Sequence, residues 1–147
     1  NNPTAISGLK LWFKSDAGVK QASNAVSKWF DQSSNGFDVA QSTSARKPTY
    51  STSTASFNNK PTLAFSSATE TYLSNTTVDV NGTTGLTWFT ILSFNETTSN
   101  QHAISGQNFS PTTQISGNTL YLDLYGASVG YSQAYTGYTN TNVDIFL

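Results

Sequence analysis

Apolar and polar residues alternate one by one along several short stretches of the chain, and this two-residue period limits which folds are open to it. The clearest stretch is L-Y-L-D-L-Y at residues 120–125, where leucines alternate with Tyr121, Asp123 and Tyr125. Weaker alternation occurs at residues 9–14, 26–30 and 78–80. Successive side chains of a strand point to opposite faces of a sheet, whereas an amphipathic helix needs an apolar residue every three or four positions. No segment sustains the helical period, so the sequence predicts half-buried strands.

Two segments depart from this simple alternation. Residues 86–94 carry apolar side chains on both faces, with Leu92 and Phe94 on one face and Phe89 and Ile91 on the other. This pattern predicts a strand near the middle of a layered structure. The stretch at 42–56 is rich in Ser and Thr, and we interpret it as an exposed loop with a short edge strand around Thr49-Tyr50-Ser51.

Turn-forming residues separate these stretches: Ser34-Asn35-Gly36, Asn58-Asn59-Lys60-Pro61, Asn81-Gly82, Ser105-Gly106 and Ser116-Gly117-Asn118. Asn and Gly tolerate the positive φ angles that tight turns require. Short strands, frequent turns and no internal repeat predict an all-β fold, either a sandwich or a barrel, in a single ordered domain over residues 1–147. The chain begins at Asn1 without an initiator methionine and ends in a strand-like run at residues 143–147 without a polar tail, so we expect this domain to be a module of a larger polypeptide.

The chain is polar but weakly charged. Of its 147 residues, 64 are Ser, Thr, Asn or Gln, whereas 7 basic and 8 acidic residues leave a net charge of -1. Such a surface cannot neutralise the phosphates of a nucleic acid, and the absence of cysteine excludes disulfides and thiolate metal sites. No apolar run approaches the roughly 20 residues that cross a bilayer, so we expect no membrane insertion. The composition is typical of extracellular, secreted or virion-surface proteins.

Five segments follow one another in an order typical of a known family. They are residues 6–19, an opening strand; 26–36, similar to a W-x-D-x-S-G-N-G turn with Ser34 in place of a glycine; 47–50, similar to a P-x-Y strand; 59–65 with 71–73, similar to N-G-K-P-x-x-x-F…Y-L with Asn59 replacing a glycine; and 86–94, a long central strand. Over about residues 6–106 the chain resembles the LamG-like, concanavalin A-like jelly-roll domains of secreted bacterial and phage structural proteins.

The resemblance implies a two-sheet antiparallel jelly-roll sandwich. It does not specify the ligand, because the family includes adhesins, carbohydrate-binding modules, phage attachment or decoration proteins and glycanases. Such domains usually close with a further strand carrying a Glu and a Tyr, which is missing here, so either the chain is truncated or another segment completes the sandwich. Within the turn, we expect Asp31 to accept backbone N–H bonds and Trp12 and Trp29 to have structural roles.

Catalysis is not expected. The glycanases of this superfamily carry E-x-D-x-x-E or E-x-D-x-E on one strand face, because glycoside hydrolysis needs two facing carboxylates. Glu70 and Glu96 have no acidic partner two or four positions on. We expect His102 to be a solvated residue in a polar loop, and no G-x-S-x-G elbow is present to use it. Asp16, Asp31 or Asp123 could contribute oxygen ligands to calcium, but without a D-x-D loop we expect no metal and no cofactor.

The best ligand-binding candidates are aromatic. Tyr121 and Tyr125 flank Asp123 on the non-leucine face of one strand, and Tyr131, Tyr135 and Tyr138 follow in a segment rich in Gly, Ser and Thr. Tyrosine offers a flat apolar ring for the C–H faces of sugars and a hydroxyl for hydrogen bonds. Tyrosine also favours strands, so the same residues could simply pack within their own domain.

The sequence therefore predicts a non-catalytic attachment module that binds glycans or polysaccharide on a cell surface. The alternative is a structural or assembly module, such as a capsid decoration, tail or fibre subunit, that self-associates or joins other structural proteins without binding sugar. Weakly charged polar edges suit this second function because they can pair without like-charge repulsion. A glycan-cleaving enzyme with a degenerate site at Glu70 is the third hypothesis.

Overall fold

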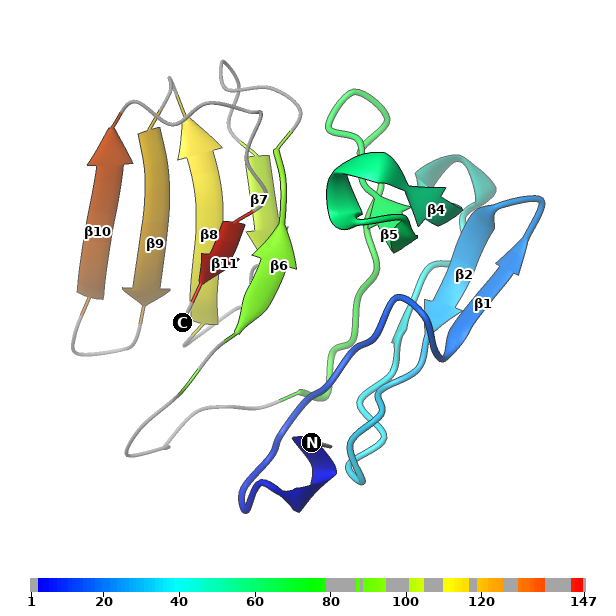
Figure 1. The fold of residues 1–147 in the computed structure, drawn as a ribbon, viewed down its shortest axis with the longest axis horizontal. Coiled ribbons are helices and arrows are strands. Elements are labelled where there is room, and N and C mark those ends of the chain that lie inside the picture. The colour runs from blue at the N-terminus through cyan, green and yellow to red at the C-terminus, as the bar shows by residue number, and fades with distance from the viewer. Residues whose placement is uncertain are drawn as a thin grey trace. The chain divides into compact units, whose positions relative to one another are not determined.

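A computed structural model describes residues 3–78, 87, 89–94, 101–104, 110–116, 119–125, 130–136 and 144–146. Every strand pairing in this part of the chain is antiparallel, and its helical structure consists of three short 3-10 turns. The chain is therefore all-β, as the alternating pattern predicts. It divides into two compact units, Asn1–Val78 and Asp79–Leu147 (Figure 1). The expectation of one domain over the whole chain stays a prediction.

The first unit contains one five-stranded sheet. Its strands are β1 (Val19–Ala22), β2 (Ala25–Trp29), β3 (Val39–Ala40), β4 (Thr49–Thr54) and β5 (Lys60–Ala64), and its 3-10 turns are η1 (Pro3–Ala5), η2 (Ser44–Arg46) and η3 (Ala55–Phe57). The order in the sheet is β1-β2-β4-β5, and β3 pairs with β2. The predicted edge strand at 49–51 is thus the start of a six-residue strand with a neighbour on each side. The polar sequence of this strand predicted an edge position, but the strand lies between β2 and β5.

Tight turns with positive φ connect the hairpins of this sheet. Ser23 and Asn24 join β1 to β2 at φ 49° and 65°, and Asn58 and Asn59 lie between β4 and β5 at φ 52° and 57°. The Asn58-Asn59 turn confirms the sequence prediction, because asparagine tolerates this left-handed conformation better than most residues. The Ser23-Asn24 turn was not predicted, because this pair contains neither Gly nor Pro.

The core of the first unit forms around β2. Val26 is fully buried, as is Pro48, whose carbonyl accepts a hydrogen bond from the Val26 amide at 2.9 Å. The Trp29 ring lies 4.9 Å from that of Phe13, centroid to centroid, and its indole N–H donates to the Lys14 carbonyl at 2.8 Å. These contacts agree with the structural role predicted for Trp29.

The strand predicted at residues 9–14 does not form. Residues 9–13 lie outside every strand, and Lys14 makes only an isolated bridge with Ala17. Residues of the turn after β2 form hydrogen bonds with the backbone of this segment instead. The Asn35 side chain donates to the carbonyls of Leu9 and Lys10, at 2.9 and 3.0 Å. Side-chain bonds thus replace the ladder that the alternation predicts.

The described residues of the second unit form two sheets. Its strands are β6 (Thr90–Leu92), β7 (Gln101–Ile104), β8 (Ser110–Ser116), β9 (Thr119–Tyr125), β10 (Gly130–Thr136) and β11 (Asp144–Phe146). One sheet has the order β10-β9-β8-β7, and the other consists of β11 and β6 (Figure 1). The strand predicted at 120–125 is confirmed as β9.

The long strand predicted at residues 86–94 is much shorter in the structure. Only Thr90–Leu92 is in a strand, and residues 86 and 88 lie outside the described residues. Phe94 is buried, but Phe89 and Ile91 are 65% and 62% exposed. The apolar residues on the two faces of this segment therefore do not mark a strand that is buried on both faces. The alternation expected at 78–80 also produces no described strand, because Val78 lies outside any strand and residues 79 and 80 are not described.

Candidate functional site

Strand β9 brings three of the predicted binding residues, Tyr121, Asp123 and Tyr125, to alternate positions on one face of the four-stranded sheet. Residues directly opposite each other in antiparallel strands lie on the same face, so the register extends this face to the neighbouring strands. Three rows result: Gln114–Tyr121–Ala134, Thr112–Asp123–Ser132 and Ser110–Tyr125–Gly130, each running from β8 through β9 to β10. We name this set of register positions the Tyr121 face. It combines two phenols and one carboxylate with hydroxyl and amide residues.

The same register assigns Tyr131 and Tyr135 to the opposite face. Tyr131 pairs with Leu124 and Tyr135 with Leu120, so both occupy positions on the leucine face of the sheet. The structure therefore does not bring these two tyrosines onto the surface of Tyr121 and Tyr125. Tyr138, the sixth predicted residue, lies outside the described residues. The sequence could not predict this division, because alternation shows which residues share a face within one strand and does not show how two strands are aligned.

His102 belongs to strand β7, so the expectation of a loop position was wrong. It pairs with Gln114 of β8, which extends the row of Tyr121 to a fourth strand. Sequence reasoning also missed Thr112, Gln114 and Ser132 as neighbours of the predicted residues. The sequence of β8 shows little alternation of apolar and polar residues, because Pro111 and Ile115 are its only apolar residues.

The turn after β2 is organised by Asp31, which is 9% exposed. Its Oδ1 accepts hydrogen bonds from the amides of Trp12 and Ser33, both at 2.9 Å, and its Oδ2 accepts from the Ser33 hydroxyl and the Phe37 amide at 2.6 and 3.1 Å. Burial raises the pKa of Asp31, but these hydrogen bonds outweigh it and hold the pKa below its ordinary value. The predicted acceptor role is confirmed, and the carboxylate is occupied by structural bonds.

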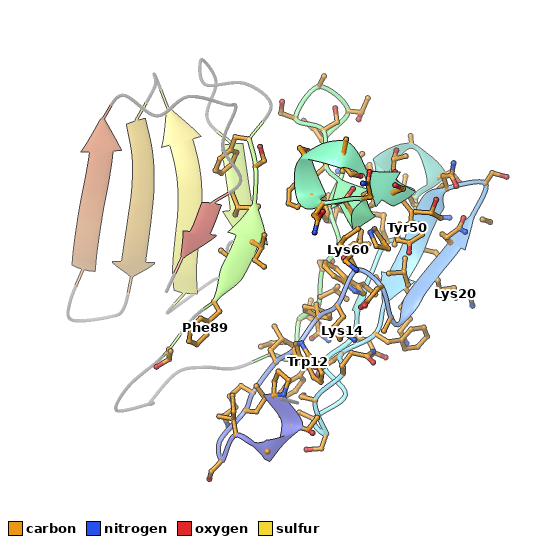
Figure 2. All side chains as sticks on the ribbon, in the orientation of Figure 1. Trp12, Lys14, Lys20, Tyr50, Lys60 and Phe89 are labelled. Carbon is orange, nitrogen blue, oxygen red and sulfur yellow. The ribbon has the colours of Figure 1, made fainter. Side chains whose placement is uncertain are left out.

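Trp12 is fixed to this turn through its backbone. Its amide bonds to Asp31, and its carbonyl accepts from the Gln32 amide at 2.7 Å. The Lys14 ammonium lies 5.6 Å from the centroid of the Trp12 ring, and the two side chains are neighbours in Figure 2. A cation at this distance interacts favourably with an indole ring. The half-buried Trp12 side chain therefore has contacts within its own unit, as a structural residue would.

Glu70, the residue of the enzymatic hypothesis, belongs to a second polar cluster in the first unit. Its carboxylate pairs with the Arg46 guanidinium at 3.3 Å, and the guanidinium carbon lies 5.9 Å from the Tyr72 ring centroid. The side chains of Gln41 and Arg46 hydrogen-bond Tyr72 and lower its pKa. Glu70 thus faces a cation, whereas hydrolysis requires a second carboxylate across the bond to be cleaved. Glu96 lies outside the described residues.

Over the described residues, no three His, Asp or Glu side chains gather in a group that could hold a metal ion. Of the calcium candidates, Asp16 pairs with Lys14 at 3.2 Å and Asp31 holds its turn. The part of the chain that is described also contains no helix long and apolar enough to cross a membrane.

Comparisons with family models, curated proteins and solved structures give no match to this chain. The resemblance to LamG-like and concanavalin A-like domains therefore rests on the sequence segments alone.

Proposed function

We propose that this chain is a non-catalytic attachment module that binds surface glycans through the Tyr121 face. The observation that supports it best is the register of β8, β9 and β10, which groups Tyr121, Asp123 and Tyr125 with hydroxyl and amide residues. Sugar rings present apolar C–H faces together with hydroxyls that both donate and accept hydrogen bonds. Phenol rings match the first, and Asp, Gln, Ser and Thr match the second.

The charge of this face favours a neutral ligand. Asp123 is the one residue in the three rows that carries a formal charge at neutral pH. A nucleic acid or another polyanion would need several cations in its place. We infer a setting outside the cell or on a virion surface, because the composition is rich in Ser, Thr and Asn and poor in charged residues.

We also propose that the chain has the concanavalin A-like jelly-roll fold. The all-β antiparallel fold supports this proposal, and so do the family-like segments in the first 106 residues. In such a sandwich the leucine face of the β7–β10 sheet would be the inner one, because apolar faces pack against each other. The Tyr121 face would then remain open to a ligand.

Binding to a glycan array, followed by solution titration of each hit, tests the function. We expect the double variant Tyr121→Ala with Tyr125→Ala to weaken binding by about tenfold or more, since each aromatic contact contributes about 1 kcal/mol. Tyr72→Ala is the matched control, because Tyr72 is an exposed tyrosine of the first unit. Equal binding by the double variant and the wild type would refute the proposed site.

The structural alternative gives a different result in the same experiment. A module that only assembles would bind no glycan on the array, yet would form ordered assemblies in solution. That outcome would refute the attachment function and leave the fold proposal intact.

A further inference from the structure

The edges of the described sheets differ in how well they are protected from pairing with another chain. An edge strand exposes a row of unpaired backbone N–H and C=O groups, and proteins block such rows with charges, prolines, bulges or short strands. The described edge strands other than β10 carry one or more of these features: β1 has Lys20 and an irregular register, β5 has Lys60 and Pro61, β7 has four residues and an irregular register, β11 has three residues and Asp144, and β3 and β6 have only two and three residues.

Strand β10 carries none of these features. Its sequence, G-Y-S-Q-A-Y-T at Gly130–Thr136, contains no charged residue and no proline. All seven of its residues pair with β9 without a shift in register, and β9 is its only partner among the described strands (Figure 1). A strand of this length that is regular and uncharged is a good template for one more strand.

The sequence of β10 is also suited to pairing with itself. An antiparallel pair that keeps each face of the sheet continuous must have its two-fold axis at one residue, and full overlap of seven residues places that axis at Gln133. Residue 131 of one copy then lies opposite residue 135 of the other, which sets Tyr131 against Tyr135 twice. Aromatic pairs in opposite positions stabilise a sheet, and no like charges meet.

We propose that β10 is a self-association edge, at which two copies of this chain join antiparallel about Gln133 into a continuous eight-stranded sheet. The two-fold arrangement uses the same edge of both copies and therefore closes as a dimer. The outer edges of this dimer are the two β7 strands, whose shortness and irregular register oppose further growth. The Tyr121 faces of the two copies would lie on the same side of the joined sheet.

This inference is independent of glycan binding, because the pairing uses backbone groups of β10 and its axis lies at a leucine-face position. Analytical ultracentrifugation of the wild-type chain over a range of concentrations tests it first. We expect a concentration-dependent dimer. A chain that remains monomeric up to millimolar concentration would overturn the proposal.

Two charge variants then test the register. Gln133→Lys and Gln133→Glu each place like charges opposite each other at the axis, and we expect each variant alone to lose the dimer. Mixing the two variants places opposite charges at the axis, so we expect a mixed dimer to form. Recovery in the mixture also shows that the variant chains are folded. A dimer that persists in either single variant, or a mixture that stays monomeric, would contradict pairing about Gln133.

Thr52→Lys is the matched control for added charge. Thr52 is exposed on β4 in the first unit, so the same substitution there leaves the β10 edge unchanged. We expect this variant to dimerise like the wild type. Loss of the dimer in Thr52→Lys would show that net charge, and not the β10 edge, controls association.

Discussion

The Asp31 carboxylate joins residues that are far apart in the sequence. It accepts hydrogen bonds from Trp12, which precedes the first sheet, and from Ser33 and Phe37 in the turn after β2. Its own amide donates to Asp38 at 3.0 Å, and Asp38 pairs with Lys28 of β2 at 2.8 Å. The buried Asp31 side chain therefore joins the N-terminal segment to the turn, and the Asp31 amide links the turn to the sheet through Asp38.

We expect Asp31→Ala to lower the free energy of unfolding by about 2–3 kcal/mol, because several backbone donors lose a charged acceptor. The loss should also depend on pH. The folded-state pKa of Asp31 lies below the unfolded value of 3.8, so its stabilisation is complete above that value and disappears as the pH falls below it. Denaturant titration of wild type and variant from neutral pH to about pH 3 measures the difference.

Asp16→Ala is the control for this prediction. Asp16 is also an aspartate, but its side chain is 57% exposed and forms a surface ion pair with Lys14. Such pairs contribute at most about 1 kcal/mol. If the stability gap between wild type and Asp31→Ala stayed constant down to pH 3, the pKa of Asp31 would not be lowered by the fold.

Local sequence patterns predicted where individual strands and turns lie better than they predicted which strands pair with each other. The 120–125 alternation and the Asn58-Asn59 turn predicted β9 and the β4–β5 connection correctly. The alternation at 9–14 failed because side chains from a distant turn satisfy the backbone there. The position of β4 between β2 and β5 was missed for a similar reason, since backbone pairing depends on chain segments brought together only on folding.

The β1–β2 hairpin offers a test at this scale. Both residues of its turn have positive φ, and Asn-Gly is the preferred pair for such turns. We expect Ser23→Asn combined with Asn24→Gly to raise the free energy of unfolding by about 1 kcal/mol, because glycine removes the steric cost of this conformation. Thermal unfolding of the double variant measures the gain.

A glycine elsewhere should have the opposite effect. Thr52→Gly, in strand β4 where positive φ is not needed, is expected to destabilise the chain by about 0.5–1 kcal/mol. If both substitutions destabilised the protein, the turn would not require the left-handed conformation.

The chain consists of two units, and their described strands form separate sheets. No described strand pairing joins residues 1–78 to residues 79–147. The buried apolar residues of the described part are also divided, with Val26 in the first unit and Phe94 in the second. Stability can therefore be distributed unevenly along the chain.

Val26→Ala tests how the units are coupled. Val26 is fully buried, so we expect a loss of about 2 kcal/mol in the unit that contains it. Hydrogen exchange should then become faster at the amides of β2 and β4 and change little at those of β8 and β9. An equal increase in both units would instead support the prediction that the chain unfolds as one cooperative domain.

From its sequence alone, the chain is expected to form short strands, to turn at Asn58-Asn59 and to be polar with few charges, and the structure contains the strands and this turn. These properties follow from side-chain period, backbone conformational preference and composition, which are local. Strand pairing in the folded chain places His102 and Gln114 in one row with Tyr121, and places Tyr131 and Tyr135 on the face of Leu120 and Leu124. These placements depend on strand register, because a one-residue slip between two strands would move the side chains of one strand to the opposite face. The hydrogen bonds between the paired strands fix the register.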